Sequence, residues 1–329
     1  MRSLLRLQSI LKLMKLNLFQ YLFLLFVVAI TAFGITPVFR KIARGVNLLD
    51  YPGGRKLQAS PVAYLGGLAV AAPITLGSLL VVFTSISSDL KNQFFLGLVL
   101  PSLTIAFIGL LDDLYQLPPW PRFIAQSGVG VITSLMLYLS DSGIKLFDNP
   151  WINGVLTSFW VVTIINALNF MDNMDGLATS LSIVISLSLF ILSYLNSQYL
   201  VAALCLAVVA ACIGFLFWNR RPASIYLGDA GALYLGFLLA AISIRVDVNS
   251  DTEIIRVLVP LLIFAIPVID ITQVVISRVV KGGSPFEGGR DHLSHLLLNK
   301  GLSEGKVLTV LTASTSALAI IGVFLAVGN

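Results

Sequence analysis

The feature that most constrains this sequence is a series of apolar runs, each about as long as a lipid bilayer is thick. A helix that crosses a bilayer needs roughly 20 predominantly apolar residues. Short polar segments separate the runs, so the chain is predicted to be an all-α, polytopic transmembrane helical bundle of about ten spans, or eleven if one is missed. The predicted spans cover residues 18–38, 62–84, 94–111, 123–139, 151–168, 177–194, 199–218, 225–245, 255–277 and 306–327.

The composition excludes a water-soluble fold. Charged residues make up 11% of the chain and hydrophobic residues 57%, whereas soluble domains carry about 25% charged residues. There is too little charge to cover a globular surface. The net charge of +5 therefore indicates membrane topology rather than a nucleic-acid partner.

The chain divides into a short basic segment and one long membrane region. Residues 1–17 are basic and rich in leucine, and they are predicted to lie as an amphipathic anchor at the membrane surface. No small-residue cleavage site follows the first apolar run, so this segment is expected to stay in the mature protein. Residues 18–329 contain no hydrophilic stretch long enough for a separate domain and are predicted to form a single integral-membrane domain.

Lys and Arg residues are divided unequally between the two alternating sets of loops. Counting those at the loop edges, one set holds thirteen of them and the other four. Basic residues beside membrane spans prefer the cytoplasm, so the richer set is predicted to be cytoplasmic. An even number of spans would place both termini on the opposite side. The richer set comprises residues 39–61, 112–122, 169–176, 219–224 and 278–305.

The unusual polar clusters all fall in this cytoplasmic set, which predicts one active site at that face. Asp112 and Asp113 end an apolar run, where two adjacent carboxylates are costly to hold. Because neighbouring side chains on a helix point about 100° apart, the pair should sit at a helix end. The structural alternative is a helix cap beside a solvated aspartate.

A second cluster repeats polar residues at every third position. Asn166, Asn169, Asp172 and Asp175 leave an apolar run with this spacing, which places them along one slowly turning stripe of a helix. Packing does not explain four polar groups in such a row. The stripe is therefore predicted to line a site.

Two further aspartates lie inside apolar runs. Asp229 is flanked by glycines, and Asp270 lies eight residues before Arg278. An intramembrane carboxylate is by default a functional candidate that needs a partner. We predict a functional role for Asp229, whereas Asp270 is open to either a functional or a buried, hydrogen-bonded role.

Two basic loops complete the set. A glycine-rich loop contains Arg55 and Lys56, and glycines let backbone N–H groups approach phosphate oxygens. The last cytoplasmic loop carries Arg290, His292 and His295, a cationic patch suited to anionic groups. The structural alternative for each loop is a solvated, positively charged turn.

Clustered carboxylates repel phosphates unless a hard divalent cation lies between them. Mg²⁺ is usually held by one or two carboxylates together with substrate phosphates. Aspartates beside basic loops therefore predict Mg²⁺-assisted phosphoryl transfer at the cytoplasmic surface, with Mn²⁺ as a substitute metal. The surrounding spans indicate that one substrate is a lipid.

Five motifs occur in order, and in these motifs the chain resembles the polyprenyl-phosphate N-acetylhexosamine-1-phosphate transferases. The resemblance covers residues 50–302, which is most of the chain. The motifs are D-x-P-x-x-R-K from Asp50, G-x-x-D-D from Gly109, N-x-x-N-x-x-D-x-x-D-G from Asn166, N-x-x-P-A-x-I-x-x-G-D-x-G from Asn219, and S-P-F from Ser284 with histidines after it.

The resemblance implies a reaction in which a UDP-amino sugar and polyprenyl phosphate give polyprenyl-diphospho-sugar and UMP. It also implies a plasma (inner) membrane enzyme with its active site in the cytoplasm, a role in starting cell-envelope polysaccharides, and a homodimer. The S-P-F form of the last motif resembles the branch that starts O-antigen, enterobacterial common antigen or teichoic-acid-type polymers. UDP-N-acetylglucosamine is therefore the expected donor.

The same resemblance implies roles for individual residues. Asp229 would be the principal Mg²⁺ ligand with Asp113 beside it, and Asp112 would engage the lipid phosphate. The catalytic group comprises Asp112, Asp113, Asp172 and Asp175. The substrate-binding group comprises Arg55, Lys56, Asn169, Arg290, His292 and His295.

Four positions depart from the family's pattern. Gln58 and Ser294 stand where relatives usually have histidine, Gly289 where an aspartate is common, and Arg122 where many have lysine. These changes fall on the donor side. They bear on sugar specificity more than on the class of reaction.

Three alternative functions are open from the sequence. A UDP-MurNAc-pentapeptide transferase would carry a different histidine-rich loop. A proton-coupled transporter would use Asp229 and Asp270 as a relay, yet transporter sites lie near the membrane midplane at a repeat interface. An inactive lipid-binding homologue would account for Gln58 and Ser294. For the transferase itself, both direct attack by the lipid phosphate and a covalent aspartyl-phosphate route are open.

Overall fold

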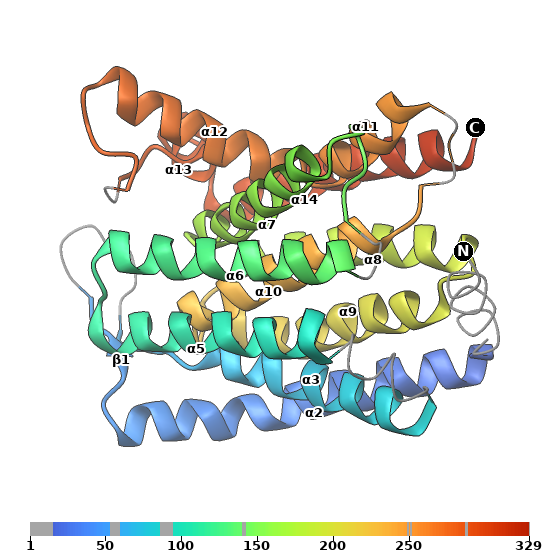
Figure 1. Ribbon diagram of the computed structural model, residues 1–329. Coiled ribbons are helices and arrows are strands. Elements are labelled where there is room, and N and C mark those ends of the chain that lie inside the picture. Colours follow the sequence, from blue (N-terminus) through green and yellow to red (C-terminus); the bar gives the residue numbers. More distant parts are fainter. Residues whose placement is uncertain are drawn as a thin grey trace.

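The computed structural model describes residues 16–52, 60–85, 95–139, 143–248, 250, 252–286 and 289–328. Long helices run back and forth along one axis (Figure 1). The start of α2 (Leu18–Gly45) and the end of α14 (Glu304–Val327) lie at the same end of the bundle. We call the opposite end, which carries the two short strands, the polar end. Most of the anchor predicted for residues 1–17 lies outside the described residues.

The predicted apolar runs each contain helix. The remaining elements are β1 (Leu49–Asp50), β2 (Val62–Ala63), α3 (Gly66–Ser85), the π-helical turn η1 (Phe95–Val99), α5 (Leu100–Tyr115), α6 (Pro119–Leu139), α7 (Pro150–Met171), α8 (Leu177–Leu195), α9 (Tyr199–Asn219), α10 (Gly228–Arg245), α11 (Glu253–Ile263), α12 (Ala265–Val280) and α13 (Leu293–Asn299).

Eight of the described helices are long and apolar enough to cross a membrane, and the number is nine if the bent pair α11 and α12 counts as one span. This confirms an all-α, polytopic membrane protein. The run predicted as one span over 255–277 is two helices that meet at 79°. Pro267 explains the break, because a proline lacks the backbone N–H that would continue the helix and its ring clashes with the carbonyl of residue 263.

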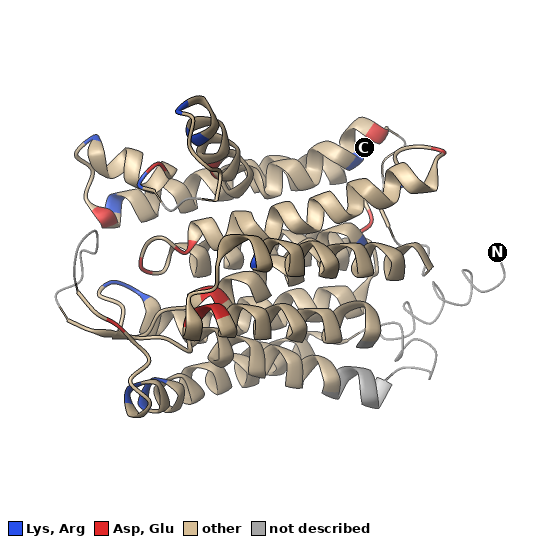
Figure 2. Cartoon of the chain, turned by 60° about the vertical axis from the view of Figure 1, so that its left-hand side comes forward, with Lys and Arg blue, Asp and Glu red and all other residues tan. Residues whose placement is uncertain are grey.

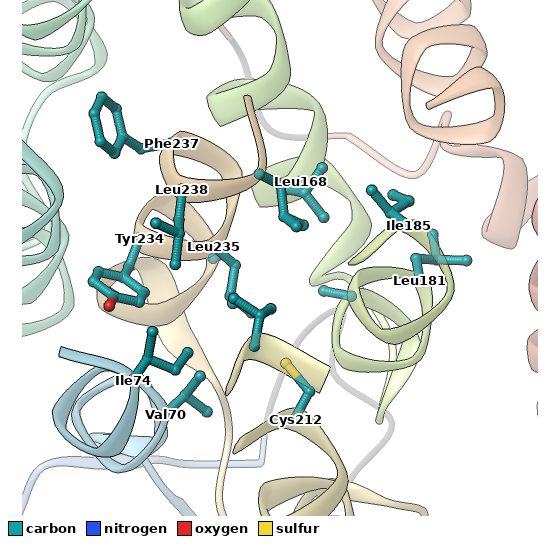
Figure 3. Close-up of a cluster of buried hydrophobic side chains, with 14 of the residues drawn as sticks. Val70, Ile74, Leu168, Leu181, Ile185, Cys212, Tyr234, Leu235, Phe237 and Leu238 are labelled. Carbon is teal, nitrogen blue, oxygen red and sulfur yellow. The ribbon is translucent and has the colours of Figure 1, made fainter. Parts of the chain in front are cut away.

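Helix α10 lies at the centre of the bundle. It is apolar on all sides apart from its first and last turns, a pattern typical of a fully buried helix, and 78% of its membrane-length window is buried. Figure 3 shows its side chains packed among those of the surrounding helices. The labelled residues are Tyr234, Leu235, Phe237 and Leu238 of α10, Val70 and Ile74 of α3, Leu168 of α7, Leu181 and Ile185 of α8, and Cys212 of α9.

Two extended segments close the polar end around the start of α10. Strand β1 pairs antiparallel with β2, with Asp50 opposite Val62. The backbone of Tyr226 then joins this pair, because its N–H donates to Ala63 O at 2.8 Å and its carbonyl accepts the Gly66 N–H at 3.0 Å. These bonds hold the loop before α10 against the loop that begins at Asp50.

Charged residues are concentrated at the polar end of the bundle. Figure 2 shows long tan stretches of helix with most of the Lys, Arg, Asp and Glu residues gathered toward the polar end. An apolar body with charge at its ends matches a protein whose sides face lipid. The described part of the polar end is therefore where water-soluble groups can meet the protein.

Candidate active site

The first turn of α10 is held by carboxylates from two other helices. Asp172, which follows α7, accepts the Gly228 N–H at 3.1 Å through Oδ2. Asp113 of α5 accepts the N–H groups of Asp229 and Ala230 at 2.9 and 3.1 Å. The first N–H groups of a helix have no partner inside it and attract negative charge. These two aspartates therefore cap α10 from outside.

Close approach of the backbones explains the glycines in two motifs. A Cβ at Gly109 of α5 would lie 2.5 Å from the carbonyl oxygen of Asp229. Gly228 has a φ of +71°, which side chains other than glycine rarely adopt, and a Cβ there would lie 2.7 Å from Asp113 Oδ2. Both glycines let Asp113 and Asp229 meet.

The side chain of Asp229 reaches away from this cap toward two other groups. Asn169 of α7 donates to its Oδ1, and Arg122 of α6 donates to its Oδ2 at 3.2 Å. Arg122 also forms an ion pair with Asp112. The Asp112 side chain is only 5% exposed and its Oδ1 accepts the Leu117 N–H at 2.8 Å, whereas Asp229 is 30% exposed. Asp229 can therefore meet a ligand, and Asp112 orients Arg122.

The four residues of the predicted polar stripe contact two different parts of the structure. Asn166 lies deeper in the bundle and donates to Gln126 Oε1 at 2.8 Å. Asn169 and Asp172 reach the start of α10, as described above. Asp175 accepts the Ala223 N–H at 2.9 Å and so fixes the loop before α10. Three of the four residues thus converge on α10 and its loop, and Asn166 belongs to the interior.

A cavity of about 650 Å³ opens at the polar end beside these residues. Its volume lies within the range of roughly 300–1,000 Å³ that small-molecule sites occupy. Asp113, Asp172, Asp175 and Asp229 are among its lining residues. The others include Asp50, Ser60, Tyr64, Asn173, Arg221, Tyr226, Gly289, Arg290, His295 and Glu304.

Helix α13 and the loop before it form one wall of the cavity. Arg290 and His295 line it, whereas His292 does not. The His292 side chain is buried, and its Nδ1 lies 2.9 Å from Oδ2 of Asp270. Asp270 is fully buried, so the hydrogen-bonded alternative for this residue is confirmed. Arg55, Lys56 and Gln58 lie outside the described residues.

Two tyrosines that the sequence analysis did not single out also line the cavity. The Tyr64 hydroxyl donates to Asp50 Oδ1 at 3.1 Å, and its ring meets that of Tyr226 edge-on at 6.0 Å. Burial raises the pKa of both phenols far above the ordinary value, with nearby aspartates adding to the effect. Both phenols therefore stay protonated, and the single O–H of Tyr64 is used in its hydrogen bond to Asp50. Tyr226 lies inside the motif that begins at Asn219, and this was the available signal for it, whereas Tyr64 lies in none of the five motifs.

Crowded carboxylates dominate the electrostatics of the site. Burial raises the pKa of the Asp172 carboxyl well above its ordinary value, and the charges of Asp229, Asp113 and Asp175 raise it further. A divalent cation would reverse this effect because it stabilises the charged carboxylates. Among the described residues, no three His, Cys, Asp or Glu side chains are grouped closely enough to hold a metal alone. Oxygen donors of this kind fit Mg²⁺, which takes one or two carboxylates and completes its shell with water and phosphate.

Known proteins with similar sequences identify the family of this chain. Residues 95–247 match the model of glycosyl transferase family 4. The chain is 29% identical to a probable undecaprenyl-phosphate N-acetylglucosaminyl 1-phosphate transferase of Bacillus subtilis, over 83% of this chain and 76% of that protein. It is 30% identical to the undecaprenyl-phosphate alpha-N-acetylglucosaminyl 1-phosphate transferases of Yersinia pestis and Escherichia coli K12. Those matches cover 87% and 86% of this chain, and 79% and 78% of the relatives.

Proposed function

Because the chain belongs to glycosyl transferase family 4, we propose that it transfers N-acetylglucosamine 1-phosphate from UDP-N-acetylglucosamine to undecaprenyl phosphate and releases UMP. The relatives' names support both the sugar and the lipid. They do not favour the pentapeptide transferase or the transporter. The observation that carries the proposal is the convergence of Asp113, Asp172 and Asp229 on a 650 Å³ cavity at one end of an apolar bundle.

The reaction joins an oxygen of the lipid phosphate to the β-phosphorus of the donor and breaks the bond from that phosphorus to the bridging oxygen. UMP leaves with the bridging oxygen. Lipid phosphate is already mostly ionised at neutral pH, because the second pKa of a phosphomonoester is about 6. Little base catalysis is needed, so positioning and charge stabilisation become the main tasks of the protein.

Several side chains at the polar end are placed to position the substrates and to stabilise charge. Arg122, held by Asp112 and Asp229, offers a cation between α5, α6 and α10 for a phosphate oxygen. Arg290 and His295, which line the cavity, suit the anionic donor. Tyr226 adds a hydroxyl group on the cavity wall, and Tyr64 uses its own hydroxyl to hold Asp50 there. Asp113 and Asp172 keep the start of α10 in place so that Asp229 faces the cavity.

We include Mg²⁺ in this proposal, with Asp229 and Asp172 as the residues that would hold it. Mg²⁺, when bound, neutralises the charge that develops on the transferred phosphate. Asp113 has less freedom to serve as a ligand, because its two oxygens already accept backbone N–H groups. We also propose that the polar end faces the cytoplasm, which the distribution of basic residues supports, and that the membrane is the plasma membrane, which is carried over from the family resemblance. A homodimer is carried over from the family resemblance.

The decisive experiment measures UMP release by the purified full-length protein with undecaprenyl phosphate, Mg²⁺ and a panel of UDP-sugars. We expect release with UDP-N-acetylglucosamine, loss of release with a chelator, and recovery on adding Mg²⁺. Release with UDP-MurNAc-pentapeptide alone would replace the proposed donor. A folded protein that releases no UMP with any donor would contradict the proposal.

A further inference from the structure

The buried aspartate of α12 has no place in the chemistry described so far. Asp270 is fully buried and does not line the cavity. Its Oδ2 accepts a hydrogen bond from Nδ1 of His292 at 2.9 Å, and its Oδ1 accepts the Leu293 N–H at 2.6 Å. A buried carboxylate without partners would be strongly destabilising. Both oxygens of Asp270 therefore bind the residues at the start of α13.

His292 is packed as firmly as its partner. It is the residue before α13, and its ring meets Phe170 of α7 edge-on with centroids 5.2 Å apart. The Leu293 N–H that Asp270 accepts is the first N–H group of α13, so one carboxylate fixes both the side chain before the helix and its first turn.

A second anchor acts one residue further into α13. Ser294 is fully buried, and its hydroxyl donates to Asn173 Oδ1 at 2.7 Å. Asn173 lines the cavity next to Asp172. Ser294 stands where the resemblance implies a histidine, so this link belongs to the present chain and not to the general pattern.

The residue before His292 is tied to α12 as well. Asp291 forms two hydrogen bonds with Arg278, at 2.8 and 2.9 Å, and Arg278 also donates to the Pro285 carbonyl at 2.8 Å. The loop segment around Arg290 is therefore held on both sides by α12. A turn of about 100° per residue means that a slip of one position in α13 would move His295 off the cavity wall.

We propose that Asp270 is a positioning residue that, through His292 and the start of α13, keeps His295 on the cavity wall where the anionic donor binds. His292 supports this wall and does not contact substrate, and Ser294 provides the second anchor through Asn173. That the cavity wall binds the anionic donor rests on the proposed function. That Asp270 fixes the orientation of His295 is independent of that function.

The first test reads the orientation of His295 without any activity. His295→Cys is labelled with a water-soluble maleimide, with and without Asp270→Asn. Both native cysteines, Cys205 and Cys212, are fully buried, so background labelling is low. Asparagine keeps the shape of Asp270 but loses its charge. Residue 295 is only partly exposed while the start of α13 is held, so freeing the helix should expose it to solvent more often, and we expect its labelling to become about tenfold faster, the equivalent of losing one hydrogen bond to a charged group.

Ser60→Cys, on another part of the cavity wall, is the matched control, and its labelling should not respond to Asp270→Asn. Ser294→Ala releases the second anchor without a change of charge and should also speed labelling at residue 295. Equal rates at residue 295 in all three backgrounds would overturn the proposal. So would a parallel rise at Ser60→Cys, since that indicates general loosening.

The second test uses the transferase assay as a double-mutant cycle. Asp270→Asn should raise KM for UDP-N-acetylglucosamine by about tenfold with a smaller effect on kcat, and it should have no further effect in a His295→Gln background. Independent, additive effects would contradict the coupling. If the wild type releases no UMP at all, the proposed function fails, while the labelling test still decides the role of Asp270.

Discussion

The carboxylate of Asp113 accepts the backbone N–H of Asp229 at 2.9 Å, although the two residues belong to different helices. The Asp229 carboxylate meanwhile faces Asn169 and Arg122. One aspartate therefore stabilises the start of α10, and the other is presented to the cavity by that same turn. Asp113 and Asp229 therefore have different roles, although the sequence predicts both as metal ligands.

Asp229→Asn should abolish most of the activity and leave the fold intact. The substitution removes a negative charge from a crowded group of carboxylates, so thermal stability should stay the same or rise. We expect kcat for UMP release to fall by about 10²–10³-fold, as for the loss of one electrostatic group at a reaction centre. Asp247→Asn, an exposed aspartate at the opposite end, is the control and should behave as wild type. Full activity in Asp229→Asn would remove this residue from the reaction centre.

Asp113→Asn should lower stability as well as activity. An amide has one acceptor oxygen, so one of the N–H groups of Asp229 and Ala230 loses its partner. An unsatisfied buried donor costs about 1–3 kcal/mol. Thermal unfolding in detergent, compared with Asp229→Asn, measures the difference. Equal melting temperatures for the two variants would mean that the external cap contributes nothing to the fold.

Gly109→Ala should force α5 and α10 apart. Its new Cβ would lie 2.5 Å from the Asp229 carbonyl oxygen, and backbone cannot give way cheaply. Overpacking of this kind costs typically 1–3 kcal/mol, and kcat should fall because Asp229 moves. Gly34→Ala in α2, where no atom lies within 4 Å of the new Cβ, should be neutral or stabilising by up to about 1 kcal/mol. Similar melting temperatures for both variants would argue against tight contact at Gly109.

The stability of the protein should depend on pH through His295. Burial lowers the pKa of His295, and His292 and Arg290 lower it further, against the opposing charges of Asp270 and Asp291. As pH falls below about 6.5, the ordinary value, the unfolded chain takes up a proton that the folded protein does not. The wild type should therefore lose stability relative to His295→Gln, until the lowered pKa is reached.

Melting temperatures of the two proteins between pH 8 and pH 5, without substrate, check this sign. The curves should coincide at pH 8 and separate below the ordinary pKa, with the wild type becoming the less stable. A wild type that gains stability over His295→Gln on acidification would show that the pKa of His295 is raised instead.

The sequence by itself determined the class of fold, because a bilayer-long apolar run can satisfy its backbone in lipid only as a helix. It also predicted that the polar clusters gather at one end, since charged residues in a chain with 11% charge are few and costly to place. Of the residues singled out from the sequence, Asp113, Asp172, Asp175, Asp229, Arg290 and His295 line the cavity, whereas Asp112, Asn169 and His292 do not, and the roles assigned to them stay predictions.

Only the tertiary structure decided which of these residues hold the start of α10 and which face the cavity. Spacing along the chain says nothing of which carboxylate meets the start of a helix from another part of the sequence, as Asp113 and Asp172 do with α10. The break between α11 and α12 and the burial of His292 against Asp270 likewise depend on contacts between distant segments. Those contacts arise from packing helices against one another, and periodicity within a single helix does not encode them.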